Sequence, residues 1–245
     1  MFNAVLFLIA IFSGATASVV GFGIGSLLTP LFALELGTSV AVAAVTLPHA
    51  LATAVRCWRL RRQVDRTVLR RFGVLSAAGA LAGALVYTRL GPTTLTGVLG
   101  GLLVLTALAQ LTGWTRHWQP RGPLVGVFGV LSGFFGGVAG NQGGLRAAAL
   151  TAFHLSPPAF VATATAAGLL VDAARTPVYL WQAGPRLAEL WVPIGIAAAG
   201  VLVGTIIGER ILLGLPPARF ARIVGGAIGV LGLWLIYTAL ATGPS

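Results

Sequence analysis

The chain carries very little charge for its length. Only 9% of its 245 residues are charged, whereas about 25% are charged in an average soluble domain. Lysine does not occur, so all sixteen basic residues are arginines, and they stand against five acidic residues. Mean hydropathy is +0.93, and hydrophobic residues make up 57% of the chain. This composition excludes an ordinary soluble monomer.

The chain also lacks the residues on which most catalytic centres depend. Its single cysteine, Cys57, excludes an internal disulfide, and its three histidines are scattered, so no cluster of metal ligands forms in the sequence. The sequence has no HExxH spacing, no pair of neighbouring carboxylates and no P-loop. A membrane enzyme acting on a lipid or quinone, the alternative class, is therefore disfavoured. We expect no catalytic residue, no metal, no cofactor and no use of ATP.

Long apolar runs recur from one end of the chain to the other, and a helix needs about 20 apolar residues to cross the hydrocarbon layer. These runs do not alternate with polar residues, as the strands of a membrane β-barrel would. The opening residues MFNAVLFLIAIF lack the basic n-region of a signal peptide, so we interpret them as a first span. The sequence predicts an all-α polytopic membrane protein with about ten membrane segments.

The positive charge is concentrated. Seven arginines lie in RCWRLRRQVDRTVLRR (56–71), between two apolar runs. Cytoplasmic loops of membrane proteins carry such an excess of arginine. The net charge of +11 would suggest nucleic-acid binding in a soluble protein. Here its placement indicates topology instead, so we expect the lipid bilayer as a partner and no nucleic acid.

The chain is an internal repeat. Residues 21–56 align without a gap with residues 140–175, with 11 identities in 36 positions. With small shifts the match continues after these residues, which divides the chain into a first repeat (1–113), a linker (114–122) and a second repeat (123–245). Among the identical pairs is Arg56 with Arg175.

Charge orients the two repeats in opposite directions. Arginines accumulate in 56–71, 114–122 and 209–222, whereas the counterparts of the first and last of these loops carry fewer. Placing all three loops in the cytoplasm requires an odd number of crossings in each repeat, with both termini outside. Such inverted-topology repeats are typical of secondary transporters.

Each repeat has a glycine-rich break followed by a short apolar segment. The breaks are VGFGIGS (20–26) and AGNQGGL (139–145). A helix over 145–155 would be only about 16 Å long, roughly half the hydrocarbon thickness. We therefore predict a re-entrant or broken helical hairpin in each repeat, with its tip near the membrane midplane and a short helix starting just after Gly25 or Gly144.

These tips have the properties of an anion site. A helix begins with unpaired N–H groups and a positive dipole end, glycine lets a ligand approach the backbone, and Arg146 has no acidic residue near it in the sequence. The alternative is that the glycines only allow close helix packing while Arg146 extends to a lipid headgroup. We expect a small anionic substrate to contact Gly23, Gly25, Ser26, Thr46, Asn141, Gln142, Gly143, Gly144, Arg146 and Thr165.

A few other polar residues lie within apolar runs. His49 either hydrogen-bonds a neighbouring helix or takes part in proton coupling, because the pKa of histidine lies near neutrality. Asp172 and Arg175 are three residues apart and share a helix face, so they either pair structurally or line the substrate path. We expect Glu35 and His154, which align in the repeats, to be solvated at the membrane faces.

The two threonines expected to contact the substrate, Thr46 and Thr165, also align in the repeats. Each either donates its hydroxyl to an oxyanion or bonds back to a carbonyl of its own helix, which is the commoner arrangement for threonine in a helix.

Four segments make the chain similar to a known family. They are GFGIGSLLTPLFAL (21–34), RRQVD (61–65), SGFFGGVAGNQGG (132–144) and VDAARTPVYLWQAG (171–184). Together with the duplicated halves, they resemble the TauE/SafE sulfite-exporter family of bacterial anion permeases over essentially the full chain. The resemblance implies a multi-pass transporter of the bacterial inner membrane that moves sulfite, a sulfonate or a related anion, with ion-coupled export expected. An anion channel and an uptake permease for another small anion are alternatives, and the sequence also allows a homo-oligomer.

Overall fold

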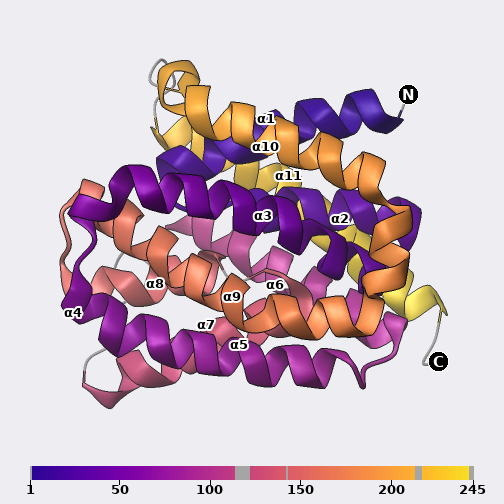
Figure 1. Cartoon of the computed structure of the whole chain (residues 1–245), viewed down its shortest axis with the longest axis horizontal. Helices are drawn as coiled ribbons and strands as arrows, with labels where there is room; N and C mark the ends of the chain where they lie inside the picture. Colours follow the sequence, from indigo (N-terminus) through magenta and orange to yellow (C-terminus); the bar gives the residue numbers. More distant parts are fainter. Residues whose placement is uncertain (1, 114–121, 142, 213–216, 243–245) are drawn as a thin grey trace.

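The structure is a computed structural model, and it describes residues 2–113, 122–141, 143–212 and 217–242. In this part of the chain ten helices of eight residues or more form an all-α bundle (Figure 1). Six helical stretches are long and apolar enough to cross a membrane. They are α3 (Thr38–Leu60), α4 (Arg66–Val68) continuing through a π-helical turn (Leu69–Gly73) into α5 (Val74–Tyr87), α6 (Pro92–Thr112), α9 (Pro157–Glu189), α10 (Trp191–Leu212) and α11 (Pro217–Thr242).

The remaining four helices form two hairpins with glycine breaks at their tips. They are α1 (Phe2–Val20), α2 (Ile24–Leu36), α7 (Pro123–Ala139) and α8 (Gly143–Leu150). The breaks use backbone angles that favour glycine: φ is 133° at Gly23, which precedes α2, and 70° at Gly140, which follows α7. The two predicted breaks are therefore present.

The short helices differ from the prediction in their bounds. Both begin one or two residues earlier than expected, at Ile24 and Gly143, and α2 continues past Pro30 to Leu36. At 1.5 Å per residue, α2 is about 20 Å and α8 about 12 Å long. A 3-10 turn (Thr151–Phe153) follows α8. Both helices are shorter than the ~30 Å hydrocarbon layer, so each has one end inside it if the other lies at a face.

The closest helix pairs join the two halves of the chain rather than neighbours in sequence. Helix α1 of the first repeat packs along α10 of the second, and its counterpart α7 of the second repeat packs along α5 of the first. Likewise α3 packs on α9 and α6 on α11, each helix against its counterpart in the other repeat. A two-fold relation between the repeats would give this pattern. The opposite membrane orientation of the repeats stays a prediction.

Glycines allow the paired helices of the two repeats to approach closely. On α5, a Cβ at Gly79 or Gly83 would overlap a backbone carbonyl of α7, and a Cβ at Gly133 on α7 would overlap one of α5. The α1–α10 pair is alike, with Gly14 and Gly204 each against a carbonyl of the partner helix. Small residues of this kind let membrane helices approach closely. The packing role weighed for glycine is thus realised along these helices.

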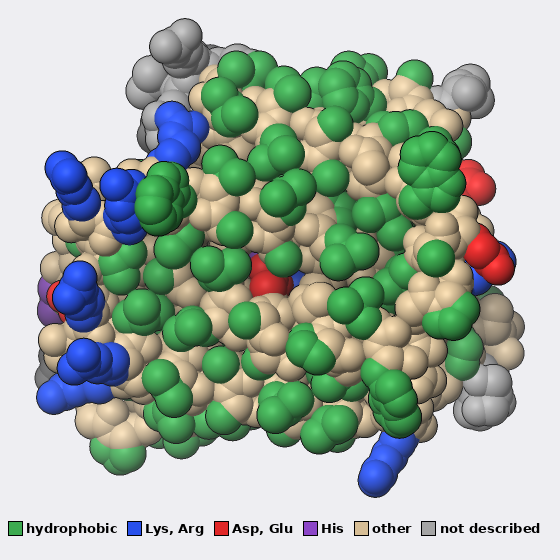
Figure 2. All heavy atoms as spheres, viewed as in Figure 1, with side chains coloured by type: hydrophobic (Ala, Val, Ile, Leu, Met, Phe, Trp, Pro, Cys, Tyr) green, Lys and Arg blue, Asp and Glu red, His purple; other side chains and the backbone are tan. Residues whose placement is uncertain are grey.

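Charge divides the two ends of the bundle. Figure 2 shows most of the visible arginine side chains at the end where α4 lies, and acidic side chains at the opposite edge. Helix α1 begins and α11 ends at that opposite end (Figure 1). We call the two ends the arginine-rich end and the opposite end. Of the other two expected cytoplasmic loops, 114–121 and 213–216 lie outside the described residues.

One expected loop boundary is wrong. We predicted a cytoplasmic loop over 56–71, but α3 continues to Leu60 and the helical turns resume at Arg66. Six of the seven arginines in this stretch are exposed, whereas Arg56 is buried inside the bundle. The reason is that arginines at helix ends and in loops give the same excess of charge in the sequence.

The separation of the two ends predicts a topology that cysteine labelling can test. With Cys57→Ser as background, Thr67→Cys in α4 and Thr94→Cys in the first turn of α6 place one exposed thiol at each end. A membrane-impermeant maleimide added to intact cells should label Thr94→Cys alone, and permeabilised cells should label both. Labelling of Thr67→Cys from outside would contradict the orientation.

Candidate functional site

The two glycine breaks meet inside the bundle. The Ser26 hydroxyl in the first turn of α2 donates a hydrogen bond to the Asn141 side-chain oxygen, at 3.0 Å. A Cβ on Gly25 would overlap the carbonyl of Gly140, and one on Gly143 would overlap the Phe22 ring. The starts of α2 and α8 therefore lie against the opposite break, although they are more than 110 residues apart in sequence.

A small cavity lies at this junction. Its volume is about 10 Å³, close to the room needed for one water molecule. Residues before and within the first turns of both short helices supply most of its wall, and a histidine of α3 completes it. The lining residues are Phe22, Gly23, Gly25, Ser26, His49, Gly140, Asn141, Gly143 and Arg146. The cavity is positive, because helix starts carry partial positive charge and unpaired N–H groups.

Arg146 supplies a full positive charge to this cavity. It lies in α8 with 2% of its surface exposed, so it does not extend to a lipid headgroup. Its Nη2 lies 3.5 Å from the Gly21 carbonyl oxygen, and its Nη1 has no hydrogen-bond partner among the described residues. The position of Gly168 on α9 makes room for it, since a Cβ there would lie 2.7 Å from Nη1. The guanidinium is therefore buried at the cavity, and its Nη1 atom is available to donate a hydrogen bond.

An ionic cluster adjoins the cavity through His49. The His49 Nδ1 atom lies 2.6 Å from one oxygen of Asp172. Arg175 donates to the other oxygen from Nε at 3.1 Å and from Nη2 at 2.8 Å, and its Nη1 donates to the Gly136 carbonyl at 2.5 Å. The expected pairing of Asp172 with Arg175 is therefore present. Because His49 also lines the cavity, Asp172 connects Arg175 to the cavity wall.

Arg56 is a further buried cation that the sequence argument missed. It is 4% exposed, its Nε donates to the Thr165 hydroxyl at 2.9 Å, and its Nη1 has no partner in the described part of the chain. The arginine-rich stretch 56–71, expected to be a cytoplasmic loop, includes it. A signal was available in its alignment with Arg175, since a mid-helix position in one repeat implies the same in the other.

These groups leave the interior with an excess of positive charge. Arg56, Arg146 and Arg175 are buried, and Asp172 is the one buried carboxylate among the described side chains. With neutral histidine, two positive charges are uncompensated. Each charge at mid-helix depth costs about 2.5 to 3.5 kcal/mol to insert. A buried anion is what would offset this cost.

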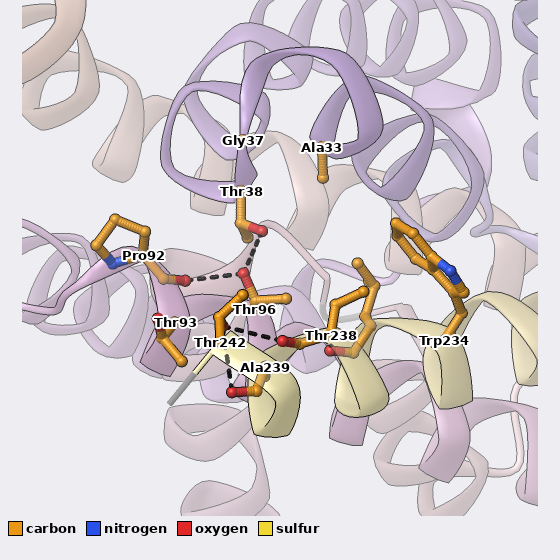
Figure 3. Close-up of a pocket in the computed structure, with 11 residues that line it drawn as sticks. Ala33, Gly37, Thr38, Pro92, Thr93, Thr96, Trp234, Thr238, Ala239 and Thr242 are labelled. Atoms are coloured by element: carbon orange, nitrogen blue, oxygen red, sulfur yellow. Dashed lines mark hydrogen bonds between the residues drawn. The ribbon is translucent and has the colours of Figure 1, made fainter. Parts of the chain in front are cut away.

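Two larger hollows lie elsewhere on the molecule. One, of about 290 Å³, is bounded by the end of α2, the starts of α3 and α6, and the end of α11 (Figure 3). Figure 3 shows threonines around it, with the Thr38 and Thr96 hydroxyls 2.6 Å apart, and no charged residue lines it. The other, of about 630 Å³, lies at the start of α7 and has one arginine, Arg71. Neither has the convergent donors of the small cavity.

A comparison with known protein families decides the class of protein. Residues 6–235 match the family described as Sulfite exporter TauE/SafE. The chain belongs to this family. No curated protein and no solved structure matches it. TauE/SafE proteins are membrane transporters and not enzymes, so this chain is a multi-pass membrane transporter.

Several other residues predicted for the site of this TauE/SafE protein lie away from the cavity. The Thr46 hydroxyl donates to the Val42 carbonyl of its own helix at 2.9 Å, which is the back-bonded alternative. Thr165 accepts its hydrogen bond from Arg56. Gly144 faces Thr106 on α6. These three residues do not line the cavity in this conformation.

The other residues predicted from the sequence fall into three groups: exposed residues, one residue outside the described part of the chain, and residues that line the cavity. Glu35 and His154 are both exposed, in agreement with a solvated position. Gln142 lies outside the described residues. Gly23, Gly25, Ser26, Asn141, Gly143 and Arg146 are the predicted substrate contacts that line the cavity.

The contact between Gly168 and Arg146 gives a test of the cavity. In Gly168→Ala the new methyl group should displace the guanidinium, because that group is the nearest heavy-atom neighbour. Sulfite binding should weaken at least tenfold, while the melting temperature without ligand changes little. Gly184→Ala on the same helix is the matched control, since a Cβ there meets nothing within 4 Å. Unchanged sulfite affinity in Gly168→Ala would contradict the placement of the site.

Proposed function

We propose that this protein is a secondary transporter that carries a small sulfur-containing anion, such as sulfite or a sulfonate, through the cavity between α2 and α8. The observation that carries this proposal is the unpartnered Nη1 of Arg146 beside two helix starts, in an interior with two positive charges in excess. A small oxyanion matches these donors in charge and in hydrogen-bonding capacity. Membership of the TauE/SafE family supports the sulfur-anion class.

Transport through this cavity requires movement. A cavity with room for about one water is too small for a four-atom oxyanion, so the hairpins have to separate to admit the substrate. The exchanged helix pairs are those expected of inverted repeats, and we infer that the two hairpins move alternately and open the cavity to one side at a time. A permanently open channel does not fit so closed a junction.

We propose that transport is ion-coupled, with His49 as the coupling group, so that a proton and the anion move in the same direction. His49 contacts both the cavity and Asp172, so a proton on it changes the charge at the cavity wall. Protonated histidine would stabilise a bound anion and pair with the carboxylate, whereas neutral histidine would weaken anion binding. Uptake of another small anion is the alternative. The class of anion that binds the protein distinguishes the two functions.

Ligand-induced stabilisation tests the substrate class. A ligand that binds only the folded protein raises its melting temperature by mass action. Sulfite, sulfonates and thiosulfate should stabilise the purified wild type, and acetate or lactate should not. Arg146→Gln should lose this stabilisation and lose transport by at least a hundredfold in vesicles, yet still insert. Stabilisation by carboxylates alone would reject the sulfur-anion class.

Replacement of His49 separates coupling from transport. In His49→Gln, downhill sulfite exchange should continue at a rate within tenfold of the wild type, but a pH gradient should no longer drive accumulation against the sulfite gradient. His154→Gln, which changes an exposed histidine, is the control and should retain both activities. Full pH-driven accumulation by His49→Gln would show that another group couples transport.

A further inference from the structure

Helix α9 aligns three guanidinium groups. Arg56 bonds the side chain of Thr165, Arg146 packs on Gly168, and Arg175 follows Asp172 along the same helix. The spacing of these α9 positions is three, four and three residues, so they share one face. At 1.5 Å per residue the row extends about 15 Å. Arg146 is in the middle of this row, with one arginine on each side.

The two outer arginines, Arg56 and Arg175, occupy equivalent positions in the repeats, but only one of them has a carboxylate beside it. Arg56 aligns with Arg175 in the repeat, and Thr53 aligns with Asp172. Arg175 therefore has a carboxylate on its own helix, while Arg56 has a threonine at the matching position. The result is a compensated charge on one side of Arg146 and an uncompensated charge on the other. The buried Nη1 of Arg56 also has no partner among the described groups.

Arg56 lies toward the arginine-rich end. On α3 it follows His49 by seven residues, or about 10 Å, in the direction of Leu60 and α4. On α9 its partner Thr165 precedes Gly168, in the direction of the α8 end of that helix. Both helices place Arg56 between the cavity and the exposed arginines beyond Leu60. The threonine-lined hollow in Figure 3 belongs to the opposite half of the molecule.

We propose that Arg56 and Thr165 form a second anion subsite, through which the substrate passes between the cavity and the arginine-rich end. This inference rests on the proposed function of the cavity. Its ligand is the same small oxyanion. The free Nη1 of Arg56 donates one hydrogen bond, and the Thr165 hydroxyl, which accepts from Arg56, has its own proton to donate. The missing carboxylate keeps the Arg56 charge available to the anion.

The subsite predicts an asymmetric effect of Arg56→Gln in oriented vesicles. For sulfite entering from the arginine-rich face, KM should rise about tenfold with little change in kcat. For entry from the opposite face, KM should stay within twofold and kcat should fall about tenfold, because the cavity fills normally but release is slowed. The ratio kcat/KM therefore falls about tenfold in both directions. The two ratios have to fall equally, because the variant cannot change the equilibrium distribution of sulfite. Arg56→Lys keeps the charge and should restore most of the activity.

Two controls separate this subsite from its alternatives. Arg59→Gln, an exposed arginine of the same helix, should leave both faces unchanged. Thermal stabilisation of Arg56→Gln by sulfite should persist, which shows a folded protein with an occupied cavity. If neither sulfite nor a sulfonate stabilises even the wild type, the proposed function fails. If it stabilises both proteins but KM rises equally from both faces, or neither parameter changes, the second subsite is wrong and the proposed function stands.

Discussion

An unbalanced positive charge inside an apolar helix bundle is the constraint on which the other features depend. The described part of the chain buries three guanidinium groups and only one carboxylate. The two helix starts at the glycine breaks add partial positive charge at the same place. The hydrocarbon layer of the membrane offers no counter-charge and no hydrogen-bond acceptor to such groups. The arrangement therefore depends on the protein that surrounds it, and the anion of the proposed function would balance its charge.

The packing around this charge also limits how the protein moves. Glycine contacts fix α1 to α10 and α5 to α7, so each hairpin is attached to a full-length helix of the other repeat. We infer that each of these closely packed pairs moves as one unit. The units that would rock against one another are therefore pairs drawn from both repeats, rather than the two repeats themselves. Ser26 and Asn141, on different hairpins, would separate when they do.

The sequence predicted the parts of this site that depend on local chemistry. Glycine breaks, short helices and a lone arginine are visible as patterns, and six of the predicted contacts line the cavity. The link from His49 to Asp172 joins residues 123 positions apart and has no spacing signal. Arg56 was misplaced because a run of arginines looks the same at a helix end as in a loop. Thr46 bonds its own helix, which the pattern left open.

The number of excess charges has a consequence for selectivity. Chloride brings one negative charge and no directional acceptors in a fixed geometry. It would leave one buried guanidinium unbalanced, as would a sulfonate, whereas the sulfite dianion of the proposed function would balance both. Discrimination by valence needs no large or shaped pocket, because the wrong ion is rejected by the charge it fails to neutralise. Under the proposed function, a tight junction of glycines and arginines would in this way favour a divalent oxyanion over chloride.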